Sequence, residues 1–298
     1  MNTFHLSGYP RIGAKRELKF AVESFWKGTS SEAELQQVAA NIRKLNWAAQ
    51  KAAGADLLPV GDFSFYDQVL DTQVALGAIP KRFGFDAANV SLPEYFQLAR
   101  GNATQFAMEM TKWFDTNYHY IVPEFTRNQK FELFSTKIIN DFVESKKLGI
   151  TTKPVLIGPV SYLLLGKEKE EGFHRIDLIE KVLPVYFEIL NALQNEGAEY
   201  IQLDEPFLAL NLTDKERNAI TYVYNEINKN FPSLKSCSRR GVVTTTFVTD
   251  AKSYNIPSRN GSTAGKVAAT PVVYCWTLSP SMNANTAPGK TLSSSISW

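Results

Sequence analysis

Three basic side chains cluster near the start of the first expected helix, where they could bind an anion. Lys15, Arg16 and Lys19 follow Gly13 in close succession. Positive charge in the first turn opposes the helix dipole, which favours acidic residues there. A docked anion would explain the cluster, because free backbone N–H groups and a guanidinium fork both bind anionic oxygens. The simpler alternative is a solvated turn in which Glu17 compensates the charge, and the residues alone leave both open.

A second group of side chains that could bind a ligand lies in the segment MTKWFDTNYHYIVPEF, from Met110 to Phe125. Its five aromatic residues fall on no helical stripe and do not alternate strictly. Rigid rings with Lys112 and Asp115 among them are typical of a binding surface held by a scaffold. The alternative is a connecting loop whose rings fill the core.

A pair of neighbouring acids, Asp204 and Glu205, follows an apolar strand and could supply a general acid and a general base. Adjacent strand residues point to opposite faces, however, so the two carboxyl groups need not share a site. A structural role, in which one acid caps the following turn, is the alternative. We predict no catalytic residue in this chain.

No convincing set of metal ligands occurs along the chain. His5, His119 and His174 are scattered, and Cys237 and Cys275 lie in a C-terminal segment of different composition. A catalytic zinc needs about three protein ligands in close geometry. We therefore assign no metal to this sequence.

Short apolar strands alternate with amphipathic helices from residue 1 to about 235, and these elements must position the candidate residues. Two helices start with capping boxes, Ser31 with Glu34 and Thr213 with Glu216. Strands are expected at 3–6, 56–60, 154–157 and 200–203, and further helices over 134–148 and 176–196. This alternation predicts an α/β fold with a parallel sheet, either doubly wound or closed into a barrel.

Each expected strand ends in glycine or polar residues, which is where barrel enzymes keep their sites. These ends are Gly8 to Arg11, Gly61-Asp62, Gly158-Pro159 and Asp204-Glu205. No glycine-rich phosphate fingerprint follows the first strand, which argues against a dinucleotide-binding fold. We therefore predict a barrel of the (β/α)8, TIM type.

The overall charge and hydropathy exclude several classes of protein. A net charge of +2 over 298 residues gives no electrostatic case for binding nucleic acid or a membrane surface. The N-terminus lacks the apolar region of a signal peptide, and the most apolar stretch, residues 154–165, is too short to span a bilayer. We expect a cytoplasmic protein.

The composition changes abruptly after Lys235. Residues 236–298 are rich in serine and threonine, contain both cysteines and include one acid, Asp250. Apart from a strand expected near residues 242–248, this segment is typical of a low-complexity tail. We therefore divide the chain into a barrel domain, 1–235, and a tail, 236–298, that is disordered or read in a shifted frame.

Several segments of the sequence resemble the N-terminal part of the cobalamin-independent methionine synthase family, and they occur in the same order as in the family. They are GYPRIGAKRELK, LLPVGDFSFYDQVL, MTKWFDTNYHYIVPEF, KPVLIGPVSYLLLGK and IQLDEPFLAL. The resemblance covers residues 1 to about 235. It implies transfer of a methyl group from 5-methyltetrahydropteroyltri-L-glutamate to homocysteine, without cobalamin, to form methionine.

The resemblance also implies that two barrels of the complete protein have different roles. The C-terminal barrel of the family carries the zinc and the homocysteine site, and the N-terminal barrel helps to hold the glutamate tail of the folate. The tail-binding residues carried over to this sequence are Arg16, Glu17, Leu18, Lys19 and Lys112. On this basis glutamate carboxylates are the anion expected at the basic cluster.

The sequence departs from the family after Lys235, where a barrel strand is replaced by Ser236 to Arg240. Only five or six of the eight barrel strands are then expected, and the zinc ligands and homocysteine pocket are absent. We expect the isolated chain to be inactive. The alternatives are a non-catalytic binding module and a barrel hydrolase that uses Asp204 or Glu205.

Overall fold

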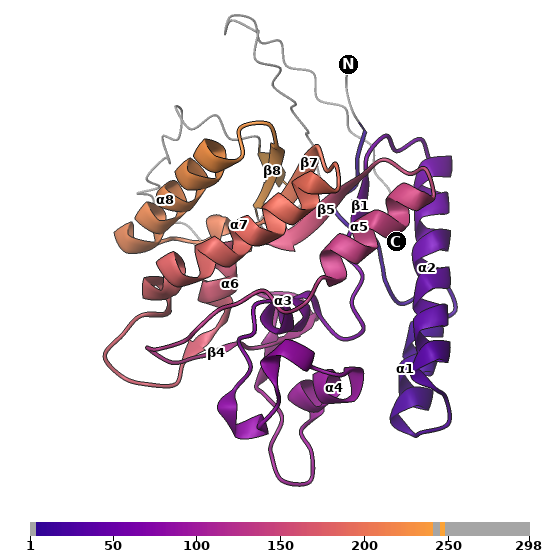
Figure 1. The fold of residues 1–298 in the computed structure, drawn as a ribbon, viewed down its shortest axis with the longest axis horizontal. Helices are drawn as coiled ribbons and strands as arrows, with labels where there is room; N and C mark the ends of the chain where they lie inside the picture. Colours follow the sequence, from indigo (N-terminus) through magenta and orange to yellow (C-terminus); the bar gives the residue numbers. More distant parts are fainter. Residues whose placement is uncertain (1–3, 241–244, 248–298) are drawn as a thin grey trace, which may run out of the picture.

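The computed structural model describes residues 4–240 and 245–247 and confirms the α/β class (Figure 1). The α-helices of this part are α1 (Glu17–Trp26), α2 (Glu32–Ala52), α3 (Gln68–Ala75), α4 (Leu92–Arg100), α5 (Lys137–Lys147), α6 (Pro159–Leu165), α7 (Ile179–Asn195) and α8 (Asp214–Asn230). Short 3-10 helices are η1 (Lys81–Phe83), η2 (Ala87–Asn89), η3 (Arg175–Leu178) and η4 (Pro206–Ala209).

The main sheet has the strand order β1-β5-β7-β8-β9. Its strands are β1 (Leu58–Val60), β5 (Thr152–Ile157), β7 (Tyr200–Asp204), β8 (Lys235–Arg240) and β9 (Thr245–Phe247). The first four are parallel and follow chain order, whereas β9 pairs antiparallel with β8. In place of the strand expected at 3–6, an isolated parallel bridge joins His5 to Leu57, beside β1.

The sheet is open within the described residues, because β1 and β9 are not paired with each other. Parallel strands laid down in chain order are compatible with a barrel wall, but closure is not seen and remains a prediction. Strand β8 runs across the domain boundary expected at residue 235. Strand β9 falls inside the segment where a strand was expected at 242–248, and the rest of the tail lies outside the described residues.

Two shorter sheets lie apart from the main one. Strands β2 (Met110–Lys112) and β3 (His119–Ile121) form an antiparallel hairpin, and β4 (Glu124–Phe125) pairs with β6 (Lys167–Glu168). The aromatic segment, which the sequence assigned to neither helix nor strand, is thus largely a hairpin followed by β4. Its strands are too short for alternation to be recognised.

Local capping explains why the helices begin where they do. Both predicted capping boxes are confirmed, Ser31 with Glu34 at α2 and Thr213 with Glu216 at α8. The helix expected from 176 instead starts as the 3-10 helix η3, because His174 caps that turn first, and α7 follows it.

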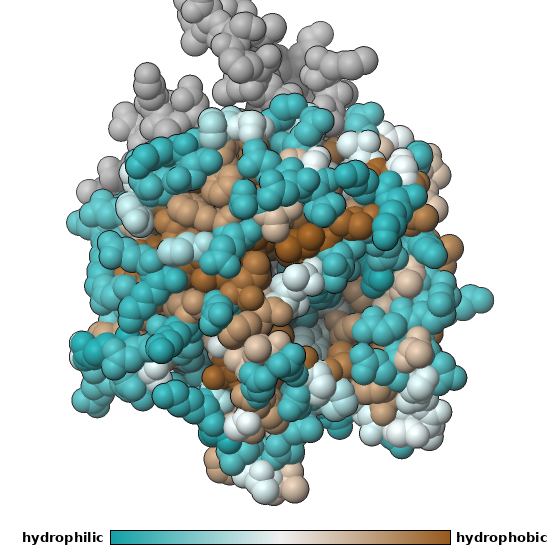
Figure 2. All heavy atoms as spheres, in the orientation of Figure 1, coloured by the Kyte–Doolittle hydropathy of each residue, from teal (hydrophilic) through white to brown (hydrophobic). Residues whose placement is uncertain are grey.

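The helices cover the main sheet and divide the apolar interior into two clusters. Helix α7 lies between α5 and α8, while α1 packs on α2 at one edge of the molecule (Figure 1). Helix α3 joins the clusters, since Val69 belongs to the one around the sheet and Leu70 to the one around α1, α2 and α4. Hydrophobic side chains are visible between the helices, framed by hydrophilic ones (Figure 2). None of the helices in the described ranges combines the length and the apolar character needed to cross a membrane.

Candidate functional site

The loop that carries the basic cluster is fixed to the carboxyl edge of the sheet by contacts from three elements. The side chain of Gln202 in β7 donates to the carbonyl of Ser7 at 2.9 Å. The backbone N–H of Tyr9 donates to Asp62, just after β1, at 2.8 Å, and Asn46 in α2 donates to the carbonyl of Pro10 at 3.1 Å. Burial raises the pKa of Asp62 to about 6. The loop after the first expected strand thus contacts residues at or near the carboxyl ends of β1 and β7.

The basic cluster lies at a strained turn into α1. Arg16 is the N-cap residue, with a left-handed φ of 64° and no side-chain cap, and Lys15 precedes it. Gly13 also has a positive φ, and a Cβ there would lie 2.2 Å from the Glu17 carboxylate. That carboxylate accepts the backbone N–H of Lys15 at 2.9 Å and so fixes the turn, but it forms no ion pair with a basic side chain of the described residues. Strain of this kind is often found at ligand sites.

The predicted tail-binding residues of this loop differ in their exposure. Arg16 is exposed and, within the described residues, forms no ion pair. Lys19 lies 3.6 Å from Glu23, a surface pair of small energetic weight. Leu18 is only 2% exposed and packs in the core, so its side chain holds the helix and does not face a ligand.

Lys112 stands on the hairpin, at the end of β2. It pairs across the hairpin with His119, is exposed, and makes no ion pair with any described residue. Residues directly opposite in an antiparallel pair share a face. Trp113 and Tyr118, joined by a 2.7 Å backbone hydrogen bond, therefore occupy the other face, where their rings touch.

The hairpin is fixed at its base by a buried acid. The carboxylate of Asp67 accepts from Val69 and Leu70 at the start of α3 and from the Ile121 N–H at 3.1 Å. Burial raises the pKa of Asp67 to about 7 against the effect of these donors. The hydroxyl of Tyr120 donates to the carbonyl of Leu165 at 3.0 Å and adds a second fixed point.

The two predicted segments meet through a residue that the sequence did not single out. The guanidinium of Arg11 lies over the Tyr118 ring, 5.8 Å from its centroid. No hydrogen bond or ion pair among the described residues joins Lys112 directly to residues 16–19. The contact between the segments is thus the Arg11–Tyr118 pair, which a reading of each segment alone could not reveal.

The acids Asp204 and Glu205 make different contacts, Asp204 as the last residue of β7 and Glu205 just beyond the strand. Asp204 accepts from the Gln202 side chain at 2.8 Å. Glu205 is fully buried and accepts the N–H groups of Ser161, at 2.7 Å, and Val160. Burial raises the pKa of Glu205 to about 7. This geometry gives no support to a hydrolase in which both carboxyl groups act on one substrate. The role of Glu205 is structural, but its side chain caps the start of α6 and not, as the sequence had suggested, the following turn η4.

A buried lysine within the sheet was not anticipated. Lys153 in β5 is fully buried and contacts Nδ1 of His5 at 2.6 Å and the Gln202 side chain. Together with the Gln202 contacts to Ser7 and Asp204, it forms a polar network inside the apolar sheet. The signal in the sequence is a lysine within a strand whose other residues are mostly apolar.

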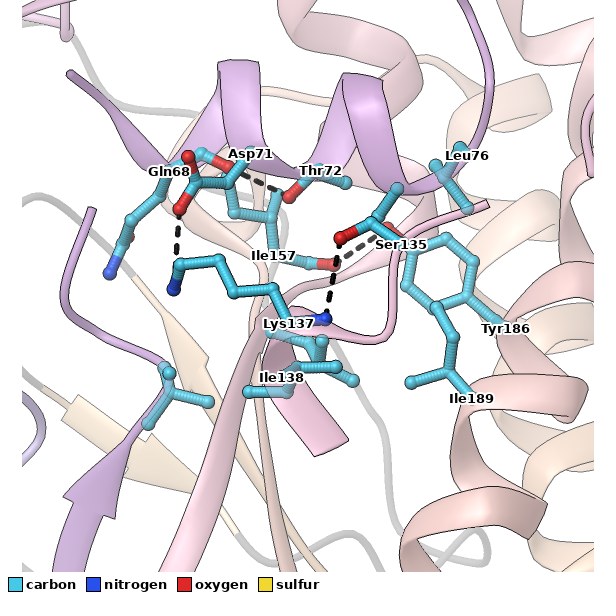
Figure 3. A pocket seen from close by; sticks show the side chains of 14 residues that line it. Gln68, Asp71, Thr72, Leu76, Ser135, Lys137, Ile138, Ile157, Tyr186 and Ile189 are labelled. Atoms are coloured by element: carbon cyan, nitrogen blue, oxygen red, sulfur yellow. Dashed lines mark hydrogen bonds and ion pairs between the residues drawn. The ribbon is translucent and has the colours of Figure 1, made fainter. Parts of the chain in front are cut away.

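Two cavities among the described residues lie away from these segments. One of about 50 Å³, under α3 and α5, is lined mainly by apolar side chains with Asp71 and Lys137 at its wall (Figure 3). It has room for no more than a few waters. A larger cleft of about 440 Å³ lies between α2, α4 and α5, where Lys137 is already paired with Asp141 at 2.8 Å.

The histidines do not gather into a metal centre. His5 contacts Lys153, His119 contacts the carbonyl of Asn117, and His174 caps η3. The described part of the chain contains no group of three or more His, Cys, Asp or Glu side chains that could hold a metal ion. The residues present therefore do not fit a zinc site.

Comparisons with known proteins agree on one family. The model of the family described as cobalamin-independent synthase, N-terminal domain, matches residues 3–256. A 5-methyltetrahydropteroyltriglutamate–homocysteine methyltransferase of Flavobacterium johnsoniae is 67% identical over 233 residues, which are 76% of this chain and 30% of that protein. The enzyme of the same name from Pasteurella multocida is 56% identical over 229 residues, which are 77% of this chain and again 30% of the relative.

Among solved structures, a candidate vitamin-B12-independent methionine synthase from Listeria monocytogenes superposes with a TM-score of 0.52. The superposition covers 82% of this chain and 67% of that one at 13% identity, so it speaks for the fold alone. The chain spans about 30% of the length of the curated relatives it matches.

Proposed function

The chain belongs to the cobalamin-independent synthase family, as its N-terminal domain, and from this premise we propose that it holds the glutamate tail of a folate methyl donor. The donor is 5-methyltetrahydropteroyltri-L-glutamate, and the complete protein transfers its methyl group to homocysteine to give methionine. Both substrates are carried over from the names of the relatives.

The observation that carries this proposal is the pair of exposed, unpaired cations on two segments that the fold brings together. Arg16 and Lys112 make no ion pair with the described residues, and Arg11 joins their segments. A chain of glutamates carries repeated carboxylates, which such cations bind with charge-assisted hydrogen bonds. Lys19 and the backbone around Glu17 and Leu18 complete the proposed tail site.

The two strained residues support the same location. Arg16, with a φ of 64°, and Phe114, with a φ of 51°, are the non-glycine residues of positive φ in the described ranges, and they lie in these two segments. Residues in this region cost about 1–3 kcal/mol each, and the surrounding structure must hold them. A ligand site at this place would give a physical reason for both residues to keep their strained backbone conformation.

Methyl transfer itself is assigned to the part of the relatives that this chain does not cover. The described residues offer no zinc cluster, so no catalytic step is placed on them. We propose that this chain alone is inactive, that its sheet is the wall of an incomplete TIM-type barrel, and that it acts in the cytoplasm.

Calorimetry on the full chain tests the proposed tail site. The triglutamyl folate is titrated into the wild type and into Arg16→Ala and Lys112→Ala, with Lys51→Ala as a matched control. Lys51 is an exposed lysine at the end of α2, which precedes the amino end of β1, and so lies at the opposite edge of the sheet. Each site variant should bind about tenfold more weakly, the size of one charge-assisted hydrogen bond.

The monoglutamyl folate provides the second arm of this experiment. Its affinity should be lower in the wild type and nearly unchanged by either site substitution, because it lacks the additional carboxylates. Equal binding of the two folates, or an equal loss in Lys51→Ala, would show that the tail is not held here.

A further inference from the structure

Arg11 belongs to one segment of the proposed tail site and contacts the other segment and a third element. It belongs to the loop that leads to Arg16, and its guanidinium lies over the ring of Tyr118 in the hairpin. One terminal N–H donates to the backbone carbonyl of Tyr66, just before α3. A single side chain therefore connects the basic loop, the start of α3 and the hairpin.

The Tyr118 side of this contact has a further neighbour. Its ring lies edge-on to the ring of Trp113, with 6.4 Å between the centroids, and burial raises the pKa of Tyr118 to about 12. Arg11 thus packs on a ring that also contacts the other side of the hairpin. Because the guanidinium is planar, it can lie against the ring while donating to the Tyr66 carbonyl, which a lysine ammonium cannot reproduce.

The hydrogen bonding of Arg11 is incomplete, which sets it apart from an ordinary structural arginine. Its Nε is buried and meets no acceptor among the described residues. Arg11 donates to the Tyr66 carbonyl and lies over the Tyr118 ring. Burial raises the pKa of Asp71, and Arg11 is near enough to that carboxyl group to lower its pKa against the effect of burial. A buried donor without an acceptor calls for an explanation beyond the local network.

Arg11 contacts the hairpin at the end opposite its base, and this decides which part of the hairpin it can position. Asp67 and Tyr120 hold the base of the hairpin, through Ile121 and Leu165. Arg11 acts at the other end, on Tyr118, which is bonded to Trp113, the residue after Lys112. Without Arg11, the base would stay in place and the end that carries Lys112 would lose its contact with the basic loop.

We propose that Arg11 is a positioning residue that holds the Lys112 hairpin at a fixed distance from Arg16, so that both cations meet successive carboxylates of one glutamate tail. This inference rests on the proposed function for its ligand. Its structural part, the coupling of the hairpin to the basic loop through Arg11, stands on the contacts alone.

Arg11→Met and Arg11→Lys test the inference in the full chain, with Arg100→Met as the matched control. Arg100 also lies over an aromatic ring, that of Trp26 at 3.7 Å, so its loss removes the same charge and the same kind of contact elsewhere. Binding of the triglutamyl folate should weaken about fivefold in Arg11→Met, as expected for one arginine–aromatic contact. Arg11→Lys should restore little of it, whereas Arg100→Met should bind like the wild type.

A double-mutant cycle separates positioning from a general effect on stability. If Arg11 places Lys112, then Lys112→Ala should weaken binding less in the Arg11→Met background than in the wild type, since contacting or coupled residues are not additive. Strict additivity would mean that Arg11 does not act through Lys112 and would overturn the proposal.

Hydrogen exchange supplies a readout that needs no ligand. The Trp113 amide, bonded to Tyr118, should exchange about fivefold faster in Arg11→Met while amides of α7 keep their rates. Unchanged exchange at Trp113 would refute the coupling even if the folate did not bind. Failure of the wild type to bind the triglutamyl folate would instead refute the proposed function, with the exchange result still deciding the role of Arg11.

Discussion

Replacing the buried acid Glu205 with glutamine should make the stability of the protein depend less on pH. Glu205 is fully buried at the end of β7 and caps the start of α6 through Ser161 and Val160. Burial raises its pKa from the usual 4.5 to about 7 in the folded protein. Glutamine keeps the size of the side chain and stays neutral at every pH.

The direction of the effect follows from proton binding. Between pH 4.5 and about 7 the folded protein holds a proton on Glu205 that the unfolded chain has released. The free energy of unfolding therefore falls as the pH rises through this window, and the loss is complete above about pH 7. At about 1.4 kcal/mol per pKa unit, the elevation corresponds to roughly 3 kcal/mol.

Urea denaturation followed by tryptophan fluorescence at pH 5 and pH 8 measures this difference. Glutamine must turn its amide N–H₂ toward one of the two backbone N–H groups, which costs free energy equally at both pH values. Asp62 and Asp67 titrate in both proteins and cancel as well. The stability of Glu205→Gln relative to wild type should therefore rise by roughly 3 kcal/mol from pH 5 to pH 8. A relative stability that is the same at both pH values would refute the raised pKa.

Two further substitutions test the local packing. Ser31→Ala removes the capping box of α2, in which the Ser31 side chain accepts the Glu34 N–H. The free energy of unfolding, measured by urea titration, should fall by about 1 kcal/mol. No loss would mean that the cap is not formed in solution. Gly158→Ala places a Cβ 2.2 Å from the Glu205 carboxyl group and should cost about 3 kcal/mol, the upper part of the range for overpacking. Gly28→Ala has no atom within 4 Å and should cost about 1 kcal/mol from its positive φ alone, so equal losses in the two variants would contradict the proposed clash.

Much of the helical structure could be predicted because its causes are local. A capping box depends on residues three apart, and both predicted boxes are present. Asp204 and Glu205 bond to different partners, as the alternation of side chains along a strand suggested, although β7 itself ends at Asp204. The aromatic segment was harder, because each strand of its hairpin has three residues and the rings of Trp113 and Tyr118 meet only after the chain turns.

The family resemblance, rather than composition or spacing, pointed to Arg16 and Lys112 as residues of one site, and their roles stay a prediction. The barrel also stays a prediction, since closure depends on pairing between the first and last strands. Beyond residue 235, strands β8 and β9 are described, and the remaining tail lies outside the described residues.

The sequence by itself determined the family, the α/β class and the two segments that carry the basic residues of the proposed site. Only the tertiary structure decided how those segments meet. The Arg11–Tyr118 contact and the buried Lys153–His5 pair, 148 residues apart, join residues whose separation hides them from any local pattern. The physical reason is that periodicity and capping act over one or two turns, whereas a binding site is assembled by packing between distant segments.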